Sequence, residues 1–265
     1  NIISINGNIK SILITKNTLS ELYERAKVSE IIEKRDVESI IQNMKKNNSS
    51  KLSIKTPKKE IWPRTDGQTK LLKEILNKEI VFVIGPAGTG KTFIAVSHAV
   101  YMLTSGLINK IIISRPAVEA GEKLGFLPGD LKEKIDPYLR PIYDSLDENL
   151  SRDKVLKLIE NQKIEIAPIA YLRGRTLNNS YIILDEAQNT SPIQMKMFLT
   201  RFGERSKMII TGDITQIDLP SKNKSGLKDA ISNLKKIKAI SFIYLTEKDV
   251  VRHSLVQKIV KAYDK

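Results

Sequence analysis

The residues with the clearest chemical meaning form one continuous run, Gly-Pro-Ala-Gly-Thr-Gly-Lys-Thr, which fits the spacing G-x-x-x-x-G-K-[ST]. An apolar run, Ile80–Ile84, precedes it, and apolar residues at helical spacing follow it from Lys91 to Ser105. Glycines let such a loop curl until its N–H groups point at phosphates, and the start of the helix adds a favourable field. We therefore predict a nucleotide-binding loop made of Gly85, Pro86, Ala87, Gly88, Thr89, Gly90, Lys91 and Thr92.

A second motif completes the chemistry of this loop. Four apolar residues, Tyr181–Leu184, are followed by the carboxylates Asp185 and Glu186. In sites of this kind the Lys91 ammonium binds the outer phosphates, while the Thr92 hydroxyl and, through water, Asp185 hold Mg²⁺. Glu186 is then the candidate base that orients and deprotonates the attacking water. A protein that only binds nucleotide needs no base there, so the two motifs together predict Mg²⁺-dependent hydrolysis of ATP.

Three further polar residues are candidates for contact with the nucleotide. The run Lys207–Thr211 ends in Gly-Asp-Ile-Thr-Gln, which places Asp213 and Gln216 beside the γ-phosphate if the run is a strand of the same sheet. A simple Gly–Asp turn is the competing interpretation. Gln68 lies 17 residues before Gly85, and its amide both donates and accepts, so it fits the edge of adenine. An exposed polar residue on a helix explains Gln68 nearly as well.

Short apolar runs rich in β-branched residues alternate with helical patterns and must position these side chains. We predict the strands Ile80–Ile84, Ile111–Ile113, Ile164–Ile166, Tyr181–Leu184, Met208–Ile210 and Ile240–Leu245. One helix, Pro192–Arg201, has a capping box of Ser191 with Gln194 and a proline at its first position. Buried strands that alternate with helices predict an α/β fold with a mostly parallel sheet sandwiched by helices.

The N-terminal part of the chain has a different character. Isoleucines on both sides of the turn signal Gly7–Asn8 predict a hairpin within residues 2–14, and apolar residues at helical spacing follow it. Residues 1–42 are thus predicted to be a small α+β segment. Residues 43–61 are rich in Lys, Asn and Ser, and are predicted to be a basic linker or an arm that orders on contact with nucleic acid. Residues 62–265 are the predicted ATPase domain.

Composition limits the other possibilities. The 265 residues carry 44 Lys and Arg against 30 Asp and Glu, a formal net charge of +14, which favours a polyanionic partner. The sequence has no Cys, which excludes disulfides and Cys-based metal sites, and its only histidines are His98, expected to be structural, and His253. No apolar run reaches the about 18 residues of a membrane span, and the sequence does not open on a signal-peptide pattern. We therefore expect a cytoplasmic protein with no membrane partner.

Several stretches together resemble the PhoH-like ATPases. They are GPAGTGKT, SRPAVEAGEKLGFLPGDLKEKIDPYLRPIYDSL, IAPIAYLRGRTLNNSYIILDEAQNTSPIQMKMFLTRFG, TGDITQIDLP followed by SGL, and LTEKDVVRHSLVQKIVKAY. The resemblance runs from Trp62 to Tyr263. It implies a P-loop NTPase with a single RecA-like core, similar to the first core of superfamily 1 helicases. It also implies ATP and Mg²⁺ as ligands, and a link to phosphate starvation and to RNA metabolism.

The resemblance implies macromolecular partners as well. The family is linked to an rRNA-maturation endoribonuclease, so single-stranded RNA, rRNA and such a nuclease are the implied partners. Relatives usually carry a longer N-terminal region similar to a KH-type RNA-binding module, of which residues 1–42 resemble only the remainder, without its GXXG clamp. Arg115 and Pro116, directly after a predicted strand, stand where helicase cores contact the nucleic-acid backbone.

Other residues of this region have two interpretations each. Arg173 and Arg175, on either side of Gly174, either bind RNA phosphate or a neighbour's nucleotide, or form a solvated basic loop. Tyr138 and Tyr171 either stack on bases or are half-buried core residues.

The length of the domain raises the question of a missing arginine. Residues 62–265 suffice for one RecA-like lobe, whereas superfamily 1 helicases hold the nucleotide between two. The arginine that stabilises the transferring phosphoryl group, worth about 10³- to 10⁵-fold in rate, must then come from another subunit or be absent. Arg252 is our candidate for this contact, in cis or in trans, and Arg201, Arg173 and Arg175 are the alternates. A homo-oligomer, either a dimer or a ring, follows as a hypothesis.

Three functions fit the sequence. The leading one is an ATPase of RNA metabolism. The second is a nucleotide-gated adaptor that presents RNA or a nuclease and has little turnover. The third, a small-molecule P-loop kinase, is weaker because Asp185 and Glu186, followed by Gly212 and Asp213 on a further strand, suit hydrolysis better.

Overall fold

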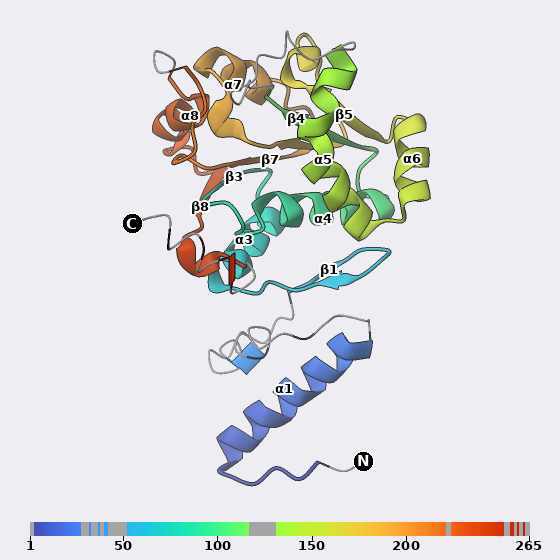
Figure 1. Ribbon diagram of the computed structural model, residues 1–265, viewed down its shortest axis with the longest axis vertical. Coiled ribbons are helices and arrows are strands. Elements are labelled where there is room, and N and C mark those ends of the chain that lie inside the picture. Colours follow the sequence, from blue (N-terminus) through green and yellow to red (C-terminus); the bar gives the residue numbers. More distant parts are fainter. Residues whose placement is uncertain are drawn as a thin grey trace.

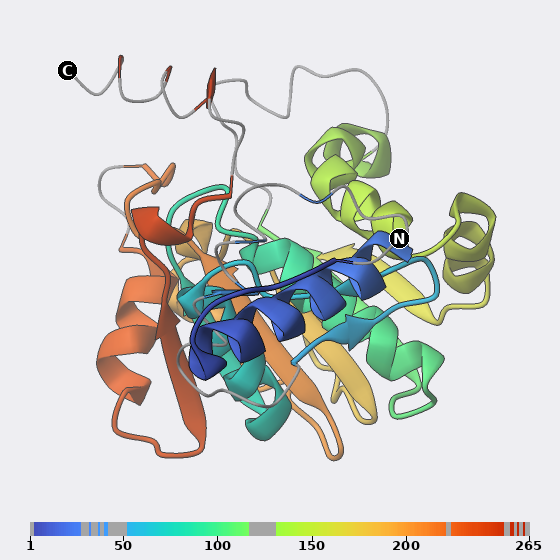
Figure 2. The ribbon, with the colours of Figure 1, turned by 90° about the horizontal axis from the view of Figure 1, so that it is seen from below.

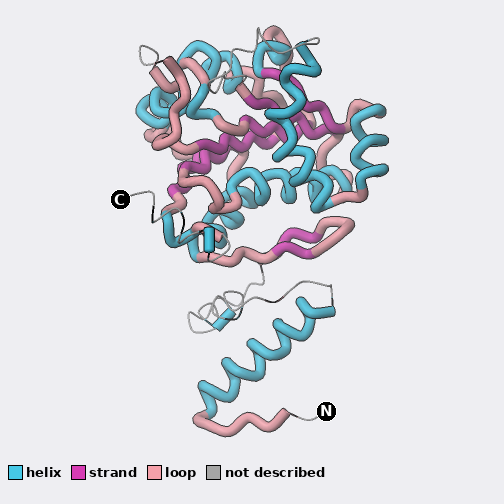
Figure 3. Tube along the Cα trace, in the orientation of Figure 1, coloured by secondary structure: helices cyan, strands magenta, loops and turns pink. Residues whose placement is uncertain are grey.

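A six-stranded sheet forms the centre of the fold (Figure 1, Figure 3). The structure, a computed structural model, describes residues 3–27, 32, 37, 40–41, 52–116, 131–220, 224–251, 255, 256, 259 and 262. The strands are β3 (Ile80–Ile84), β4 (Lys110–Arg115), β5 (Ile164–Pro168), β6 (Ser180–Leu184), β7 (Lys207–Gly212) and β8 (Ile240–Tyr244). Their order is β5-β4-β6-β7-β3-β8, and every neighbouring pair is parallel. The predicted α/β fold is confirmed, and each strand lies where the sequence predicted it.

Two layers of helices cover the sheet, because the side chains of each buried strand alternate between its faces. In β3, Val81 and Val83 join the core on one face, with α3 (Asp66–Asn77), α4 (Lys91–Thr104), α5 (Leu131–Asn149) and α6 (Arg152–Glu160). Phe82 and Ile84 join the core on the other, with α7 (Pro192–Leu199), α8 (Gly226–Leu234) and the 3₁₀ helix η2 (Ile169–Leu172). In Figure 1, α3 and α4 lie below the sheet, and α7 and α8 lie above it.

The parallel register brings the candidate residues to one edge of the sheet. Ile84 pairs with Gly212 across β3 and β7, and Leu184 pairs with Ser114 across β6 and β4. The glycine-rich loop therefore follows β3 at the same edge at which the two carboxylates follow β6. The carboxyl ends of β4 and β7 lie beside them, which is the position where ligands bind in open α/β sheets.

Residues 52–61 are part of this domain rather than a flexible linker. They form the antiparallel hairpin of β1 (Ile54–Lys55) and β2 (Glu60–Ile61), and Ile54 and Ile61 are buried in the core that contains α4. Its lysines bind the end of α5: Lys59 Nζ lies 2.7 Å from Glu148 Oε2, and Lys58 Nζ donates to the Asp147 carbonyl at 2.6 Å. Lysines of the kind that led to the prediction of a solvated linker instead make these contacts.

The hairpin predicted within residues 2–14 is wrong. Residues from Ile9 to Lys27 form one helix, α1, and no residue of the described segment 3–27 is in a strand. Asn8 begins the helix, since its Oδ1 accepts a 2.8 Å hydrogen bond from the N–H of Ser11, a capping role that competes with turn formation. Figure 1 shows α1 apart from the sheet and its helices, and in Figure 2, which is seen from below, α1 lies in front of them. None of the helices in the described residues is long and apolar enough to cross a membrane.

Candidate active site

The glycine-rich loop, residues 85–92, joins β3 to α4 in a conformation that leaves backbone donors for a ligand. Gly88 and Gly90 both have a φ of 81°, in the left-handed region that glycine adopts without strain. Gly90 is also the residue before α4, and it has no side chain to cap the first N–H groups of that helix. Uncapped N–H groups at a helix start attract anions, and phosphate fits them.

Lys91 lies within the curl of the loop. Its Nζ donates hydrogen bonds to the carbonyl of Gly85 at 2.6 Å and to that of Pro86 at 2.8 Å. The loop is closed further by Thr89, whose hydroxyl donates to the same Pro86 carbonyl at 2.9 Å. The ammonium is therefore already at the place where charge-assisted bonds to phosphate oxygens would form.

Asp185 and Thr92 meet at the mouth of the loop. Oδ1 of Asp185 accepts hydrogen bonds from the hydroxyl of Thr92 at 2.7 Å and from that of Thr211 at 2.6 Å. The Asp185 backbone N–H donates to the Ser114 carbonyl at 2.9 Å, which fixes the residue between β4 and β6. A hydroxyl beside a carboxylate is a hard-oxygen donor set, which fits Mg²⁺.

Glu186 follows in a strained backbone conformation. Its φ is 52°, in the left-handed region, which costs a non-glycine residue about 1 kcal/mol. The carboxylate is held on two sides: Oε2 accepts a 2.6 Å hydrogen bond from Nε2 of Gln188, and Oε1 lies 3.5 Å from Nη2 of Arg115. Strain of this kind is retained where the side chain must take one position.

Gln188 links Glu186 to β7, and the sequence analysis did not single it out. It is buried in the short helix η3 (Ala187–Asn189), and its Oε1 accepts a 2.9 Å hydrogen bond from the N–H of Asp213. The only signal was its place two residues after Glu186. A buried amide that binds both the candidate base and the next strand orients the site.

Asp213 makes the contacts of a simple turn and also has an oxygen that can contact a ligand, so it combines the two interpretations that the sequence left open. Its Oδ1 accepts bonds from the N–H and the hydroxyl of Thr215, at 2.9 and 2.6 Å, as in a simple turn. Its Oδ2 is buried and has no hydrogen-bond partner among the described residues, so it can accept from a bound water or ligand. Gln216 is exposed in the same turn, and its backbone N–H donates to the Asp213 carbonyl at 3.2 Å.

Gln68 is buried, which excludes the interpretation of an exposed helix residue. Its Nε2 donates to the Thr89 carbonyl at 3.0 Å, and its Oε1 accepts from the N–H of Arg64 at 2.7 Å. The amide thus holds the phosphate loop against the start of α3. Each end of the amide retains capacity for one more bond.

A second set of hydrogen bonds, made by Asp249, fixes the start of α3. Oδ1 of Asp249, in the 3₁₀ helix η4 (Glu247–Asp249), accepts from the Thr65 hydroxyl at 2.6 Å and from the Gly67 N–H at 3.1 Å. Burial raises the pKa of Asp249, but hydrogen bonds from Thr65, Thr246 and Gly67 outweigh it and leave the pKa below its ordinary value. Two residues later, the Val251 N–H donates to the Gly88 carbonyl at 2.9 Å.

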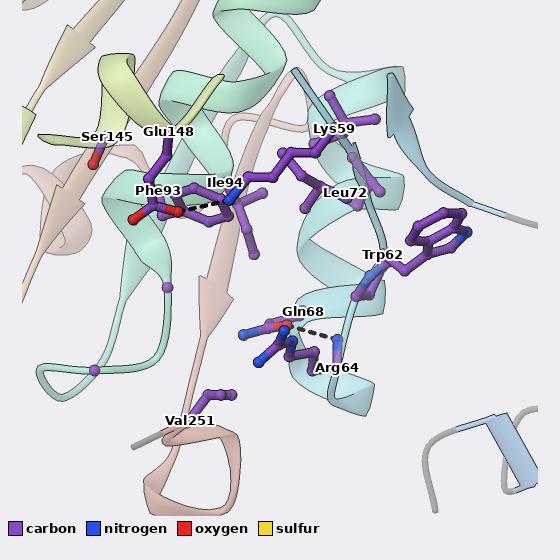
Figure 4. A pocket seen from close by; sticks show the side chains of 15 residues that line it. Lys59, Trp62, Arg64, Gln68, Leu72, Phe93, Ile94, Ser145, Glu148 and Val251 are labelled. Atoms are coloured by element: carbon purple, nitrogen blue, oxygen red, sulfur yellow. Dashed lines mark hydrogen bonds and ion pairs between the residues drawn. The ribbon is translucent and has the colours of Figure 1, made fainter. Parts of the chain in front are cut away.

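A pocket of about 370 Å³ opens beside the loop (Figure 4). The β1–β2 hairpin, α3, α4 and the end of α5 surround it, and its lining includes Lys59, Arg64, Gln68, Leu72, Phe93 and Ile94. Lys59 lies 4.9 Å from the centre of the Phe93 ring and pairs with Glu148, which ties the hairpin to both helices. Apolar walls with a few fixed polar groups suit a flat heterocycle.

Comparison with known proteins places the chain in a family. The family model described as PhoH-like protein matches residues 60–264. The chain belongs to the PhoH-like protein family. It is 61% identical over 207 residues to a PhoH-like protein of Bacillus subtilis (strain 168), an alignment that covers 78% of this chain and 65% of the relative. It is 44% identical over 205 residues to Protein PhoH of Escherichia coli (strain K12), covering 77% and 58%.

This PhoH-like chain spans less than two thirds of the length of these relatives. Among solved structures, a Pif1 helicase from Candida albicans matches with a TM-score of 0.41 and 14% identity, over 76% of this chain and 43% of that one. The family and the geometry together give the domain a P-loop NTPase fold.

The arginines proposed from the sequence have different environments in this PhoH-like domain. Arg175 is bound to Glu165 through two hydrogen bonds, of 2.5 and 2.9 Å, and Arg201 donates to the Met197 and Arg175 carbonyls. Arg173 is exposed. Arg252 lies outside the described residues, as does the side chain of Tyr138. Arg175 and Arg201 are thus committed to structural contacts.

Proposed function

We propose that this chain hydrolyses ATP with Mg²⁺ and couples hydrolysis to the binding or remodelling of RNA, rRNA included, in the cytoplasm. The observation that supports hydrolysis is the convergence of Lys91, Thr92, Asp185 and Glu186 at the carboxyl edge of the sheet. Net charge supports the RNA partner, since an excess of 14 positive charges favours a polyanion.

Each residue has a role in this proposal. The loop N–H groups and the Lys91 ammonium bind the outer phosphates, and Thr92 and Asp185 hold Mg²⁺, which neutralises phosphate charge when bound. Glu186 orients the attacking water and accepts its proton, while Gln188 keeps the carboxylate in place. Asp213, whose Oδ2 has no hydrogen-bond partner in the described part of the chain, and Gln216 stand at the end of β7, where they can contact the same water or the γ-phosphate.

Adenine is the base that the pocket beside the loop favours. Phe93 offers a ring face, and Gln68 retains one donor and one acceptor, which match the adjacent acceptor and donor of adenine. Preference for ATP over GTP in a competition assay is the expected result.

The variants Lys91→Ala and Glu186→Gln test the hydrolytic function. Lys91→Ala removes a charge-assisted phosphate contact and should lose nucleotide affinity. Glu186→Gln should keep affinity and lower turnover by about 10²- to 10⁴-fold, because only the base is lost. Lys154→Ala, on α6, is the matched control for the first variant. Hydrolysis by Glu186→Gln at the parental rate would contradict the mechanism.

A nucleotide-gated adaptor is the second candidate function. It is favoured by the internal contacts of the site, in which Lys91 binds its own loop and Glu186 binds Gln188 and Arg115. Tight ATP binding with negligible turnover, with or without RNA, would select this function. An rRNA-maturation endoribonuclease is the partner to test for such an adaptor.

The site requires a cation opposite Glu186 as charge develops in the transition state. Arg252 is the proposed residue, supplied by a second subunit of a homo-oligomer. Mixed Arg252→Ala and Glu186→Gln subunits should then regain partial activity, because some interfaces combine two intact halves. A fully active monomer would exclude the shared site.

A further inference from the structure

The 3₁₀ helix η2 presents an aromatic ring at the same edge of the sheet as the candidate base. β5 pairs with β4 so that Pro168 lies opposite Arg115, and η2 follows Pro168 directly. Ile169 and Leu172 anchor η2 in the core, being 3% and 0% exposed, whereas Tyr171 between them is 59% exposed. A ring that stands in solvent on a fixed turn loses little conformational entropy when it stacks on a ligand.

Arg173 follows the ring on the same rigid segment. Its backbone N–H closes the turn on the Ala170 carbonyl at 3.2 Å, and its exposed side chain makes no hydrogen bond or ion pair within the described residues. The next arginine is fixed: Arg175 binds Glu165, and Arg201 Nη1 donates to the Arg175 carbonyl at 3.0 Å. Of the two arginines beside Gly174, Arg173 is therefore the one whose head group faces solvent.

Arg115 connects this edge to Glu186. Its Nη2 lies 3.5 Å from Glu186 Oε1, and the two side chains are 21% and 37% exposed. A partly exposed pair at this distance contributes little stability, so a phosphate can replace the carboxylate as partner of the guanidinium. When it does, Oε1 of Glu186 becomes available to a water.

We propose that η2 and the end of β4 form a subsite for single-stranded nucleic acid, in which Tyr171 stacks on a base, Arg173 binds a phosphate, and Arg115 exchanges Glu186 for a phosphate. The proposal rests on the proposed function and deepens it. An exposed ring beside arginines is the arrangement by which unpaired bases and their backbone are bound without sequence preference. Arg115 is a positioning residue here, because it acts on the reaction through Glu186.

Affinity for a labelled oligouridylate, measured by anisotropy on the full chain, tests the subsite. Tyr171→Ala should weaken binding about 5- to 150-fold, the range of one stacked base, and Tyr171→Phe should not. Arg173→Gln should weaken binding and lower the salt slope by about 1. The controls are Tyr244→Ala, 55% exposed on the opposite edge strand β8, and Arg205→Gln, exposed before β7. Equal losses in the variants and their controls, or no losses, would overturn the subsite.

A double-mutant cycle tests the exchange at Arg115 without any turnover. Glu186→Gln removes the competing carboxylate, so it should raise oligouridylate affinity about two- to fivefold in the absence of nucleotide. In the Arg115→Gln background the same substitution should change nothing. Glu160→Gln, exposed at the end of α6, controls for the altered net charge. A gain that persists without Arg115, or no gain at all, would overturn the exchange.

Turnover distinguishes failure of this inference from failure of the proposed function. Arg115→Gln should raise the RNA-independent ATPase rate and lose most of the stimulation by oligouridylate. Suppose that the chain hydrolyses ATP through Glu186, but that Arg115→Gln lowers the basal rate and leaves the stimulation undiminished. This result would refute the exchange and leave the proposed ATPase function intact. A chain with no turnover in any variant would refute the ATPase, while the affinity measurements would still decide the subsite.

Discussion

Gln188 donates a 2.6 Å hydrogen bond from Nε2 to Oε2 of Glu186, and its other amide atom accepts from the Asp213 N–H at 2.9 Å. One buried side chain thus fixes the candidate base at the end of β6 relative to the end of β7. Since Glu186 already has a strained backbone, with a φ of 52°, its carboxylate is positioned from both the main chain and the side chain.

Gln188→Ala should therefore reduce turnover more than nucleotide affinity. The variant releases the Glu186 carboxylate and leaves the buried Asp213 N–H unpaired, which costs about 1–3 kcal/mol of stability. We expect kcat to fall about 10- to 100-fold with nucleotide Kd nearly unchanged, since positioning of the base is part of its effect. Gln194→Ala, on α7, loses only a helix cap and is the control. A fall in affinity as large as that in kcat would exclude the positioning role.

Gly212→Ala should disturb the same bond from the other side. A Cβ at Gly212 would lie 2.8 Å from Gln188 Oε1 and 2.6 Å from Leu227 Cδ2, closer than carbon atoms are found in proteins. Either the amide or α8 must move, so we expect lower kcat together with a lower urea midpoint. Gly106→Ala, whose Cβ would meet no described residue within 4 Å, is strained only by its φ of 70° and is the control for a glycine substitution without this contact. Unchanged kcat in Gly212→Ala would show that the amide adapts.

The sheet was predictable because its strands are buried on both faces and therefore read as continuous β-branched runs. The run Ile80–Ile84 matches β3 residue for residue, and the capping box of Ser191 with Gln194 starts α7 as predicted. The N-terminal part was not predictable in this way. Asn8 is compatible with a turn and with a helix cap, and only the chain that follows decides between them.

The candidate site was likewise predictable only in part. Residues within a spacing motif, such as Lys91, Thr92 and Asp185, come together as the motif requires. Contacts between segments distant in sequence carry no local signal, which is why the bond between Gln188 and Asp213 and the ion pair between Arg115 and Glu186 were missed. Burial of the β1–β2 hairpin was missed for a related reason, since its lysines mask two core isoleucines.

His98 predicts a pH dependence of stability. It is buried in α4 with Nδ1 3.1 Å from the Tyr181 hydroxyl, and burial, with a smaller contribution from the Lys207 charge, lowers its pKa from 6.5 to about 3. A lowered pKa means that the neutral ring stabilises the fold above pH 6.5, and that this contribution is lost as the pH falls toward 3. The loss at pH 5 should be about 2 kcal/mol.

The variant His98→Gln isolates this effect, because glutamine retains a polar contact and does not titrate. Urea unfolding of the variant should depend less on pH between 6.5 and 5 than that of the parent. Glu165 does not interfere in this window: the hydrogen bond from Arg175, opposed by burial, lowers its pKa from 4.5 to about 2, so its contribution is lost only below pH 4.5. Parallel stability curves for variant and parent would show that His98 is not the group responsible.

Two truncations locate the start of the folded domain. Removal of residues 1–51 leaves the β1–β2 hairpin in place and should change the free energy of unfolding of the sheet domain little. Removal of residues 1–61 takes away Ile54, Ile61 and the Lys59–Glu148 pair, and uncovers the core beside α4. Each buried isoleucine contributes about 2–5 kcal/mol, a large share of the stability of a domain. The longer truncation should therefore unfold at much lower urea, and the full chain with Ile54→Ala and Ile61→Ala should reproduce most of the loss. Equal urea midpoints for the two truncations would show that the hairpin is dispensable and that the domain begins at Trp62.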